Sequence, residues 1–329
     1  MKIFVTRAIP ERGLALLKEI HDVEINPHDR VLTKDEILKG IQGKDGLLCL
    51  LTDTIDEESI TSEPRLKMIA NYAVGYNNID IRAATERGIP VSNTPGVLTD
   101  ATAEMAWALL FAASRRIVEG DRFTRAGKFH GWGPLLMLGQ DISGKTLGVV
   151  GAGRIGTAFA LKSKGFDMKV LYADNQRNEI LERELNAQKV TLPKVLKEAD
   201  FLSLHVPLLN ITHHFIGERE LKMMKETAVL INTSRGPVID EAALAKALRE
   251  HWIFSAGLDV YEHEPEIHEE LLSLDNVVLQ PHAASATGSS RTKMAVMAAE
   301  NMLAGLRGQR PPHCVNPEVF NRKNNKATG

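Results

Sequence analysis

One stretch of the sequence constrains the fold more than any other: an apolar run over 146–150 followed by Gly151, Gly153 and Gly156. The apolar, β-branched run favours a buried strand, and residues 157–164 after the glycines favour a helix. The first glycine permits a tight turn, the second lets backbone approach a pyrophosphate, and the third lets helix and strand pack closely. The stretch therefore predicts a dinucleotide-binding unit, with phosphate on the amides that open the helix.

The residues after this motif strengthen the prediction. A second strand is expected over 168–173, and it ends at Asp174. A carboxylate at about this distance from the glycines accepts hydrogen bonds from ribose hydroxyls and repels a 2′-phosphate. We therefore expect NAD as the cofactor, with NADH preferred, held by the three glycines, Arg154, Ile155 and Asp174.

Composition limits the other function classes. The 329 residues suffice for two ordinary domains, and a net charge of −2 provides no broad basic field for nucleic acid or a membrane surface. No apolar run in the sequence reaches membrane-spanning length. Cys49 and Cys314 form no redox motif, which fits a reducing, cytoplasmic setting. The pairs His213/His214 and His263/His268 lack a convincing ligand set, so no metal is expected.

Strand and helix patterns alternate on both sides of the dinucleotide motif, as in α/β folds. Turn-rich joints separate the parts at 93–98 and 283–290. We expect two doubly wound parallel-sheet domains of the α/β class. A flavodoxin-like substrate domain would be formed by 1–99 together with 288–329, and a Rossmann dinucleotide-binding domain by 100–287.

Some elements are expected from local signals. Thr33 to Glu36 forms a capping box, Asp240 can cap a helix, and the last long helix is expected over 291–307. That helix is expected to return to the first domain. The polar tail from Arg322 is expected to be disordered.

A long helix rich in Ala, Leu and Trp is expected over 101–119, and an irregular stretch over 120–143. The irregular stretch carries many apolar side chains, including Trp132 and Leu138. One interpretation is a loop packed on its own domain. The other is a subunit interface, because so much apolar surface in a loop needs a partner. We expect a homodimer built on 101–140.

Three polar residues follow expected strands of the second domain: Arg235, Glu264 and His282. Taken singly, they could be a surface arginine, a solvated carboxylate and a capping histidine. Ligands bind beyond the carboxyl ends of parallel strands, so together they indicate an active site. A protonated His282 can donate to a carbonyl oxygen while hydride reaches the carbon, and Glu264 can stabilise the imidazolium. Arg235 can hold a substrate carboxylate with its planar fork.

Four motifs follow one another along the chain: GAGRIG at 151–156, INTSRGPVID at 231–240, GLDVYEHEP at 257–265 and PHAASAT at 281–287. Their order and spacing resemble the signatures of D-isomer-specific 2-hydroxyacid dehydrogenases, across essentially the whole chain. The resemblance implies that Arg235, Glu264 and His282 are catalytic. Further cofactor contacts are expected at these positions: His205, whose alternative role is capping, Pro207, Thr233 and Asp259.

The resemblance also implies the substrate. The family's backbone cradle for the substrate carboxylate maps onto Ala73, Val74 and Gly75, and His282 and Arg235 complete the site. Stretches 48–53 and 132–139 look most like the glyoxylate/hydroxypyruvate reductases, which implies reduction of glyoxylate and hydroxypyruvate to D-2-hydroxy acids. Leu51 would lie near the substrate's third carbon and disfavour large or charged side chains.

Departures from the family keep alternatives open. Ala283 and Ala284 stand where Ile-Gly is often found, and the NADP-using reductases usually lack an acid at the position of Asp174. Another D-2-hydroxyacid dehydrogenase, of the D-lactate or D-3-phosphoglycerate type, is one alternative. A formate dehydrogenase would carry Gln in place of Glu264. A non-catalytic, NAD-sensing corepressor similar to the C-terminal-binding proteins keeps much of the same site, although the expected lack of long extensions argues against it.

Overall fold

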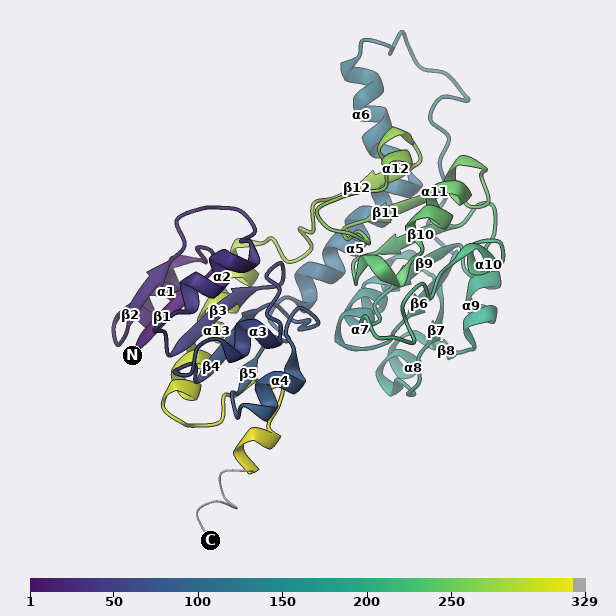
Figure 1. Cartoon of the computed structure of the whole chain (residues 1–329). Helices are drawn as coiled ribbons and strands as arrows, with labels where there is room; N and C mark the ends of the chain where they lie inside the picture. Colours follow the sequence, from purple (N-terminus) through teal and green to yellow (C-terminus); the bar gives the residue numbers. More distant parts are fainter. Residues whose placement is uncertain (322–329) are drawn as a thin grey trace. The chain divides into compact units, whose positions relative to one another are not determined.

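The computed structural model describes residues 1–321 and divides into two compact units (Figure 1). Unit 1 is formed by residues 1–98 and by the chain from 286 onward, and unit 2 by residues 99–285. The crossings therefore lie one and two residues from the positions expected at 99 and 287. The tail from Arg322, expected to be disordered, lies outside the described residues.

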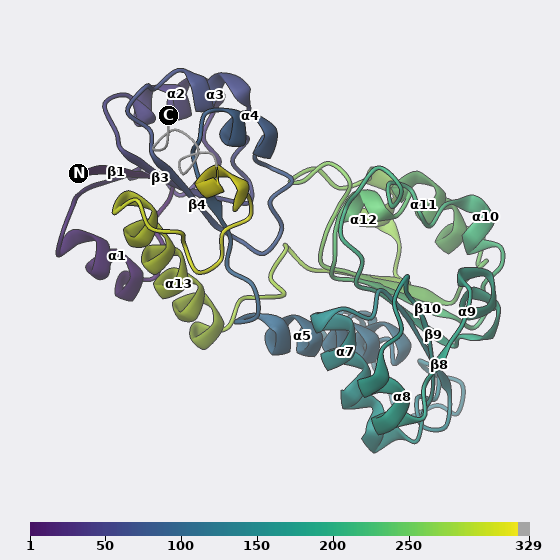
Figure 2. The ribbon, with the colours of Figure 1, turned by 90° about the horizontal axis from the view of Figure 1, so that it is seen from below.

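Unit 1 is a five-stranded sheet in the order β2-β1-β3-β4-β5, and every neighbouring pair is parallel. This is the strand order of flavodoxin-like sheets, so the expected fold is confirmed. Helices α1 and α13 pack on one face, and α2, α3 and α4 on the other (Figure 2). The bounds are β1 Lys2–Val5, α1 Glu11–Lys18, β2 Asp22–Ile25, α2 Lys34–Ile41, β3 Gly46–Leu50, α3 Glu57–Thr61, β4 Met68–Tyr72, α4 Ile81–Glu86, β5 Val91–Ser92 and α13 Gly288–Leu306.

Side-chain caps set the helix starts in this unit. The Thr33 hydroxyl accepts from the Glu36 amide at 3.3 Å, and the Glu36 carboxylate accepts from the Thr33 amide at 2.9 Å. The expected capping box is therefore confirmed. The last helix begins at Gly288 rather than at 291, because the Thr287 hydroxyl accepts from the Ser290 amide at 3.1 Å.

Unit 2 is a seven-stranded parallel sheet in the order β12-β11-β10-β9-β6-β7-β8. The order reverses between β6 and β9, which is the topological switch point of a Rossmann fold. Helices α5 and α7 cover one face, and α9, α10 and α11 the other. The bounds are α5 Thr99–Ser114, α6 Ile117–Arg125, β6 Thr146–Val150, α7 Arg154–Leu161, η1 Lys162–Phe166, β7 Lys169–Ala173, α8 Glu179–Leu185, β8 Gln188–Lys189, α9 Leu192–Glu198, β9 Phe201–Leu204, α10 Glu218–Leu221, β10 Val229–Asn232, η2 Gly236–Val238, α11 Glu241–Arg249, β11 Ser255–Leu258, α12 Glu269–Ser273 and β12 Val277–Leu279.

The core of unit 2 is anchored by β6 and α5. Leu147 and Val149 point into the cluster that contains Trp107, whereas Val150 points into the cluster on the opposite face. Trp107 is 6% exposed, and its indole N–H donates to the Phe159 carbonyl at 2.9 Å. Burying side chains of this size contributes about 1.5–3 kcal/mol each, so the strand that leads to the glycine loop is rigidly held.

The region after α5 differs from the sequence prediction. The single helix expected over 101–119 is two helices, because α5 ends at Ser114 and Arg116 adopts a left-handed backbone with φ +53°. The chain returns at Gln140, whose amide donates to the Ser114 carbonyl at 2.8 Å. This return occupies a carbonyl at the end of α5 and stops the helix there. Among residues 1–321, none of the helices is both long and apolar enough to cross a membrane.

Candidate active site

The glycine loop connects β6 to α7 in a conformation that only glycine fits. Gly151 has φ +91°, and a Cβ there would lie 2.7 Å from the His205 carbonyl carbon. A Cβ at Gly156 would overlap the Gly151 carbonyl oxygen. A Cβ at Gly153, in contrast, would meet no atom of the described chain within 4 Å. The second glycine is therefore not required by packing, and it leaves the backbone open at the start of α7, where a pyrophosphate binds in this motif.

Asp174 lies directly against this loop. One carboxylate oxygen accepts from the Ala152 amide at 2.7 Å, and the other accepts from the Gln176 amide at 2.9 Å. Asn178 donates to the Ala152 carbonyl at 2.8 Å and so holds the loop from the other side. Each carboxylate oxygen has a second lone pair for a further donor. The sequence prediction paired Asp174 with the glycines, and the structure brings them together.

The other expected cofactor residues follow the neighbouring strands. The His205 ring lies 2.9 Å from the Ser203 hydroxyl and packs on Phe159, and burial lowers the pKa of His205 to about 3. His205 is therefore a neutral packing group between β9 and α7. Thr233, after β10, has a buried hydroxyl with no hydrogen-bond partner in the described chain, which is the state expected of a group that a ligand satisfies. Pro207 is exposed, and its carbonyl accepts from Thr212.

Arg235 is positioned by a tight turn at the end of β10. The Asn232 carboxamide accepts from the Ser234 amide at 3.0 Å and donates to the Arg235 carbonyl at 3.0 Å. The next residue, Gly236, packs so closely on Tyr261 that a Cβ would overlap the Tyr261 carbonyl. Burial lowers the pKa of Arg235, with Glu264 acting in the opposite direction, and a guanidinium remains charged in proteins. The turn therefore brings a partly buried cation to the segment that carries Glu264.

His282 and Glu264 form a direct pair. The His282 Nδ1 and the Glu264 Oε2 lie 2.8 Å apart, and the Glu264 Oε1 accepts from the Tyr261 amide at 3.1 Å. Burial acts to raise the pKa of Glu264, but the hydrogen bond and charge of His282 outweigh it, so this pKa lies below its ordinary value. Glu264 is thus a carboxylate, and it selects Nδ1 of His282 as a donor. Nε2 of the same ring makes no hydrogen bond to residues 1–321. The His282 side chain as a whole is 23% exposed.

Asp259 holds the turn on which His282 lies. Asp259 is fully buried, and its two carboxylate oxygens accept from the Ala283 amide at 2.7 Å and the Ala284 amide at 2.8 Å. His282 has the left-handed φ of +52° that this turn requires. The family departure at residues 283 and 284 leaves the contact intact, because the donors are backbone groups. Sequence reasoning named Asp259 only as a cofactor residue and missed this role, for which the motif offers no separate signal.

The expected substrate residues of unit 1 also follow strands. Leu51 follows β3 and Ala73 follows β4, and the ends of these two strands pair at Leu50 and Tyr72. Leu51 is half-buried, and Ala73 is 3% exposed. The two positions therefore lie at the same carboxyl edge of the unit 1 sheet.

The segment 73–75 offers amide donors at this edge. Its three carbonyl oxygens are occupied: Ala73 accepts from the Thr94 amide at 2.8 Å, Val74 from the Asn93 side chain at 2.7 Å and Gly75 from the Asn71 side chain at 2.9 Å. Within residues 1–321, no hydrogen bond occupies the amides of Val74 or Gly75. Fixed carbonyls and free amides make the segment suited to a carboxylate.

The chain matches a family model along its second unit. The model is described as "D-isomer specific 2-hydroxyacid dehydrogenase, NAD binding domain", and it matches residues 107–284. The chain is also 53% identical over 320 residues to a glyoxylate reductase of Korarchaeum cryptofilum, a match that covers 97% of this chain and 96% of the relative.

Solved structures agree with this match. A protein from Thermus thermophilus superposes with a TM-score of 0.90 at 44% identity, over 96% of this chain and 100% of that one. An NADPH-dependent glyoxylate/hydroxypyruvate reductase from Sinorhizobium meliloti, solved with NADP and malonate, superposes with a TM-score of 0.84 at 31% identity, over 97% and 98%. The resemblance carried by the four motifs is confirmed, and the chain belongs to the D-isomer specific 2-hydroxyacid dehydrogenases, with the family's NAD-binding domain in its second unit.

Proposed function

We propose that this chain reduces small 2-keto acids, glyoxylate and hydroxypyruvate, to the corresponding D-2-hydroxy acids with a reduced nicotinamide cofactor. The observation that carries the proposal is the hydrogen-bonded pair of His282 and Glu264. Asp259 holds the turn that carries His282, and the turn at Arg235 packs on the segment that carries Glu264. The glyoxylate reductase names of relatives such as the one from Korarchaeum cryptofilum support the substrate class.

The proposed roles follow from the contacts. Bound reduced nicotinamide supplies the hydride for the carbonyl carbon. His282 donates a proton from Nε2 to the carbonyl oxygen, while Glu264 accepts a hydrogen bond from Nδ1–H and stabilises the imidazolium. Arg235 holds the substrate carboxylate through parallel N–H donors.

The proposal also assigns substrate-binding residues in unit 1. The free amides of Val74 and Gly75 suit a carboxylate, and a backbone site of this kind does not depend on the substrate's side chain. The bulk of Leu51 favours two- and three-carbon acids over aromatic, branched or dicarboxylic ones. Discrimination by one or two methylenes is about 10–200-fold, so pyruvate should be a weak substrate.

The cofactor preference is proposed to be NADH over NADPH. Asp174 keeps a negative charge beside the glycine loop, where it repels a 2′-phosphate. Arg177, the nearby cation that could soften this preference, is engaged by Glu182 at 2.5 Å. The relative from Sinorhizobium meliloti is NADPH-dependent, so direct comparison of the two cofactors is the test of this assignment.

The proposed assembly is a homodimer built on 101–140. The irregular stretch after α6 exposes large apolar side chains, among them Trp132 at 86% and Leu135 at 80%. Figure 1 shows α6 and this stretch extending away from the sheet of their own unit. Exposed apolar surface of this kind favours contact with a second copy. A monomer mass by light scattering at micromolar concentration would rule this out.

The proposed location is the cytoplasm. Both cysteines are free thiols in the structure, and Cys49 is buried. Free thiols suit a reducing compartment.

The deciding experiment is steady-state kinetics of the full chain with a panel of 2-keto acids. Glyoxylate and hydroxypyruvate should give the highest kcat/KM at fixed NADH. A higher kcat/KM for phenylpyruvate or a branched acid would contradict the proposed substrates. The assignment to the family would still hold. Absence of turnover with every acid and both cofactors would favour a corepressor of the same fold.

A further inference from the structure

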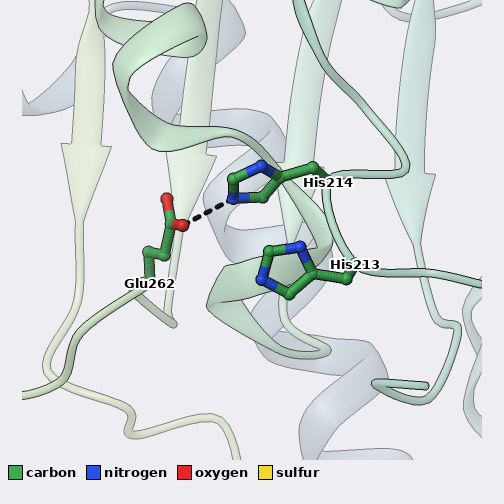
Figure 3. A group of neighbouring side chains, drawn as sticks. All are labelled: His213, His214 and Glu262. Atoms are coloured by element: carbon green, nitrogen blue, oxygen red, sulfur yellow. Dashed lines mark hydrogen bonds and ion pairs between the residues drawn. The ribbon is translucent and has the colours of Figure 1, made fainter. Parts of the chain in front are cut away.

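Three side chains that can bind a metal ion lie together in unit 2, outside the proposed catalytic cluster: His213, His214 and Glu262 (Figure 3). Their ligand atoms all lie within 4.8 Å of one another. The His214 Nε2 lies 2.5 Å from the Glu262 Oε1, and the centroids of the two imidazole rings are 4.1 Å apart. From the sequence no metal was expected, because the two histidine pairs lack a convincing ligand set. Glu262, 48 positions from His214, is the ligand that the fold adds.

The fold holds these residues in place. His214 has a left-handed backbone with φ +49°, and its amide donates to the Pro237 carbonyl at 2.8 Å. Glu262 and the buried Glu241 exchange hydrogen bonds: the Glu262 amide donates to the Glu241 carboxylate at 2.8 Å, and the Glu241 amide donates to Glu262 Oε2 at 3.2 Å. The Glu262 carboxylate is therefore fixed by one oxygen while the other faces His214.

The Glu262 carboxylate faces the two imidazoles. Its Oε1 lies against His214 Nε2, and its Oε2 accepts from the Glu241 amide. Both histidines are exposed, so their rings can rotate and water can reach them. An anionic oxygen beside two imidazoles is a donor set for a divalent cation.

The geometry and donor types point to an ion of the zinc class. Two imidazoles and one carboxylate suit Zn²⁺ and related transition-metal ions rather than the oxygen-seeking Ca²⁺ or Mg²⁺. Zinc binds nitrogen and oxygen at about 2.0–2.1 Å, so two donor atoms of a tetrahedral site lie about 3.3–3.4 Å apart. The observed separations, from 2.5 Å for His214 and Glu262 to at most 4.8 Å across the group, bracket this spacing, and rotation of the two exposed imidazole rings adjusts them to it.

We propose that His213, His214 and Glu262 form a surface site for a divalent transition-metal ion such as Zn²⁺, with water completing four-coordination. The ion lies between His214 and Glu262, where the hydrogen bond lies in its absence, and binding weakens as the pH falls because protons compete for the imidazole nitrogens. The bound ion joins the turn after β9, which carries the two histidines, to the segment after β11. Its ligand there, Glu262, lies two residues before Glu264. Occupancy should therefore stabilise the fold, and unfolding should move to higher temperature.

The test is a titration of the metal-free full chain with ZnCl₂ at pH 7.5, by calorimetry and equilibrium dialysis. The wild type should bind one Zn²⁺ per chain with an accompanying rise in Tm. His213→Ala should weaken binding at least tenfold and abolish the rise in Tm. His28→Ala, which removes an exposed histidine of unit 1, is the matched control and should behave as the wild type.

Two further arms keep the outcome decisive. Glu262→Gln retains the size of the side chain but removes its charge, and it should also weaken binding. Titration with Co²⁺ should give the strong visible absorption of a four-coordinate site in the wild type and lose it in His213→Ala. Equal Zn²⁺ affinity in the wild type and His213→Ala, or no stoichiometric binding by a wild type that keeps its reductase activity, would overturn the proposal.

Discussion

The two units place different kinds of binding groups at the carboxyl edges of similar parallel sheets. Unit 1 presents backbone amides, on a segment whose carbonyls are held by Thr94, Asn93 and Asn71. Unit 2 presents charged side chains, the His282–Glu264 pair and Arg235. A backbone site keeps its donors whatever side chains it carries, whereas a side-chain site depends on residue identity and on pH. Substitutions of the charged side chains in unit 2 should therefore have large effects, whereas side-chain substitutions on the amide segment of unit 1 should have small ones.

The largest effect is expected from removal of the proposed proton donor. His282→Ala should lower kcat with glyoxylate by about 10²–10⁴-fold, the usual range for general acid–base catalysis. Binding of NADH, followed by its fluorescence, should change little. Near-normal turnover would show that His282 is not the proton donor.

A smaller loss is expected when the guanidinium is replaced by an ammonium. Arg235→Lys keeps the charge but loses the two parallel donors, and hydrogen bonds to charged groups contribute roughly 1.5–3 kcal/mol. The kcat/KM for glyoxylate should fall about 10–100-fold with NADH affinity unchanged. Unaltered kinetics would show that Arg235 does not anchor the substrate carboxylate.

The cofactor preference should respond to the charge beside the glycine loop. Asp174→Asn removes the repulsion of a 2′-phosphate while keeping an acceptor for the Ala152 amide. The ratio of kcat/KM for NADH over NADPH should fall roughly tenfold or more, since juxtaposed like charges cost several kcal/mol. A ratio equal to that of the wild type would mean that Asp174 serves only to hold the loop.

The pH profile tests the pair itself. Glu264 has a lowered pKa, so its carboxylate supports His282 at neutral pH and this support is lost only on acidification through that lowered pKa. Glu264→Gln should therefore move the alkaline fall of the reduction rate to lower pH. Rates measured from pH 5 to 10 check this, and an unmoved profile would leave Glu264 with a purely structural role.

The smallest effect is expected from a side-chain substitution in the segment 73–75, which offers backbone amides. Val74→Ala keeps the amide and its neighbours, so kcat/KM should change by no more than about twofold. Steady-state kinetics with glyoxylate, compared with the wild type, test this prediction. A loss as large as that of Arg235→Lys would show that the Val74 side chain, rather than the backbone, binds the substrate.

Sequence reasoning performed best where a function is built from neighbouring residues. The β6–glycine–α7 turn and Asp174 follow from local steric and hydrogen-bonding requirements, and the structure brings them together. Arg235, Glu264 and His282 could be grouped because parallel strands end at one edge.

The remaining features depend on contacts between distant segments. The buried Asp259 accepts hydrogen bonds from the Ala283 and Ala284 amides, 24 and 25 residues away. No sequence motif predicts this contact. The break after α5 depends on a returning residue, Gln140, rather than on any helix-breaking proline or glycine at the site. Helices as short as α3, α10 and α12 offer too few residues for a hydrophobic period to be visible.

The hydrogen bond between the Ser114 carbonyl and the Gln140 amide has a further consequence. It brings the two ends of residues 115–139 to one place, while Val118 and Arg122 of α6 add contacts to the same domain. A segment attached in this way can be shortened, lengthened or exchanged without altering the path of α5 or of β6. In the proposed homodimer built on 101–140, the contact between copies can therefore change while the two sheets keep their course.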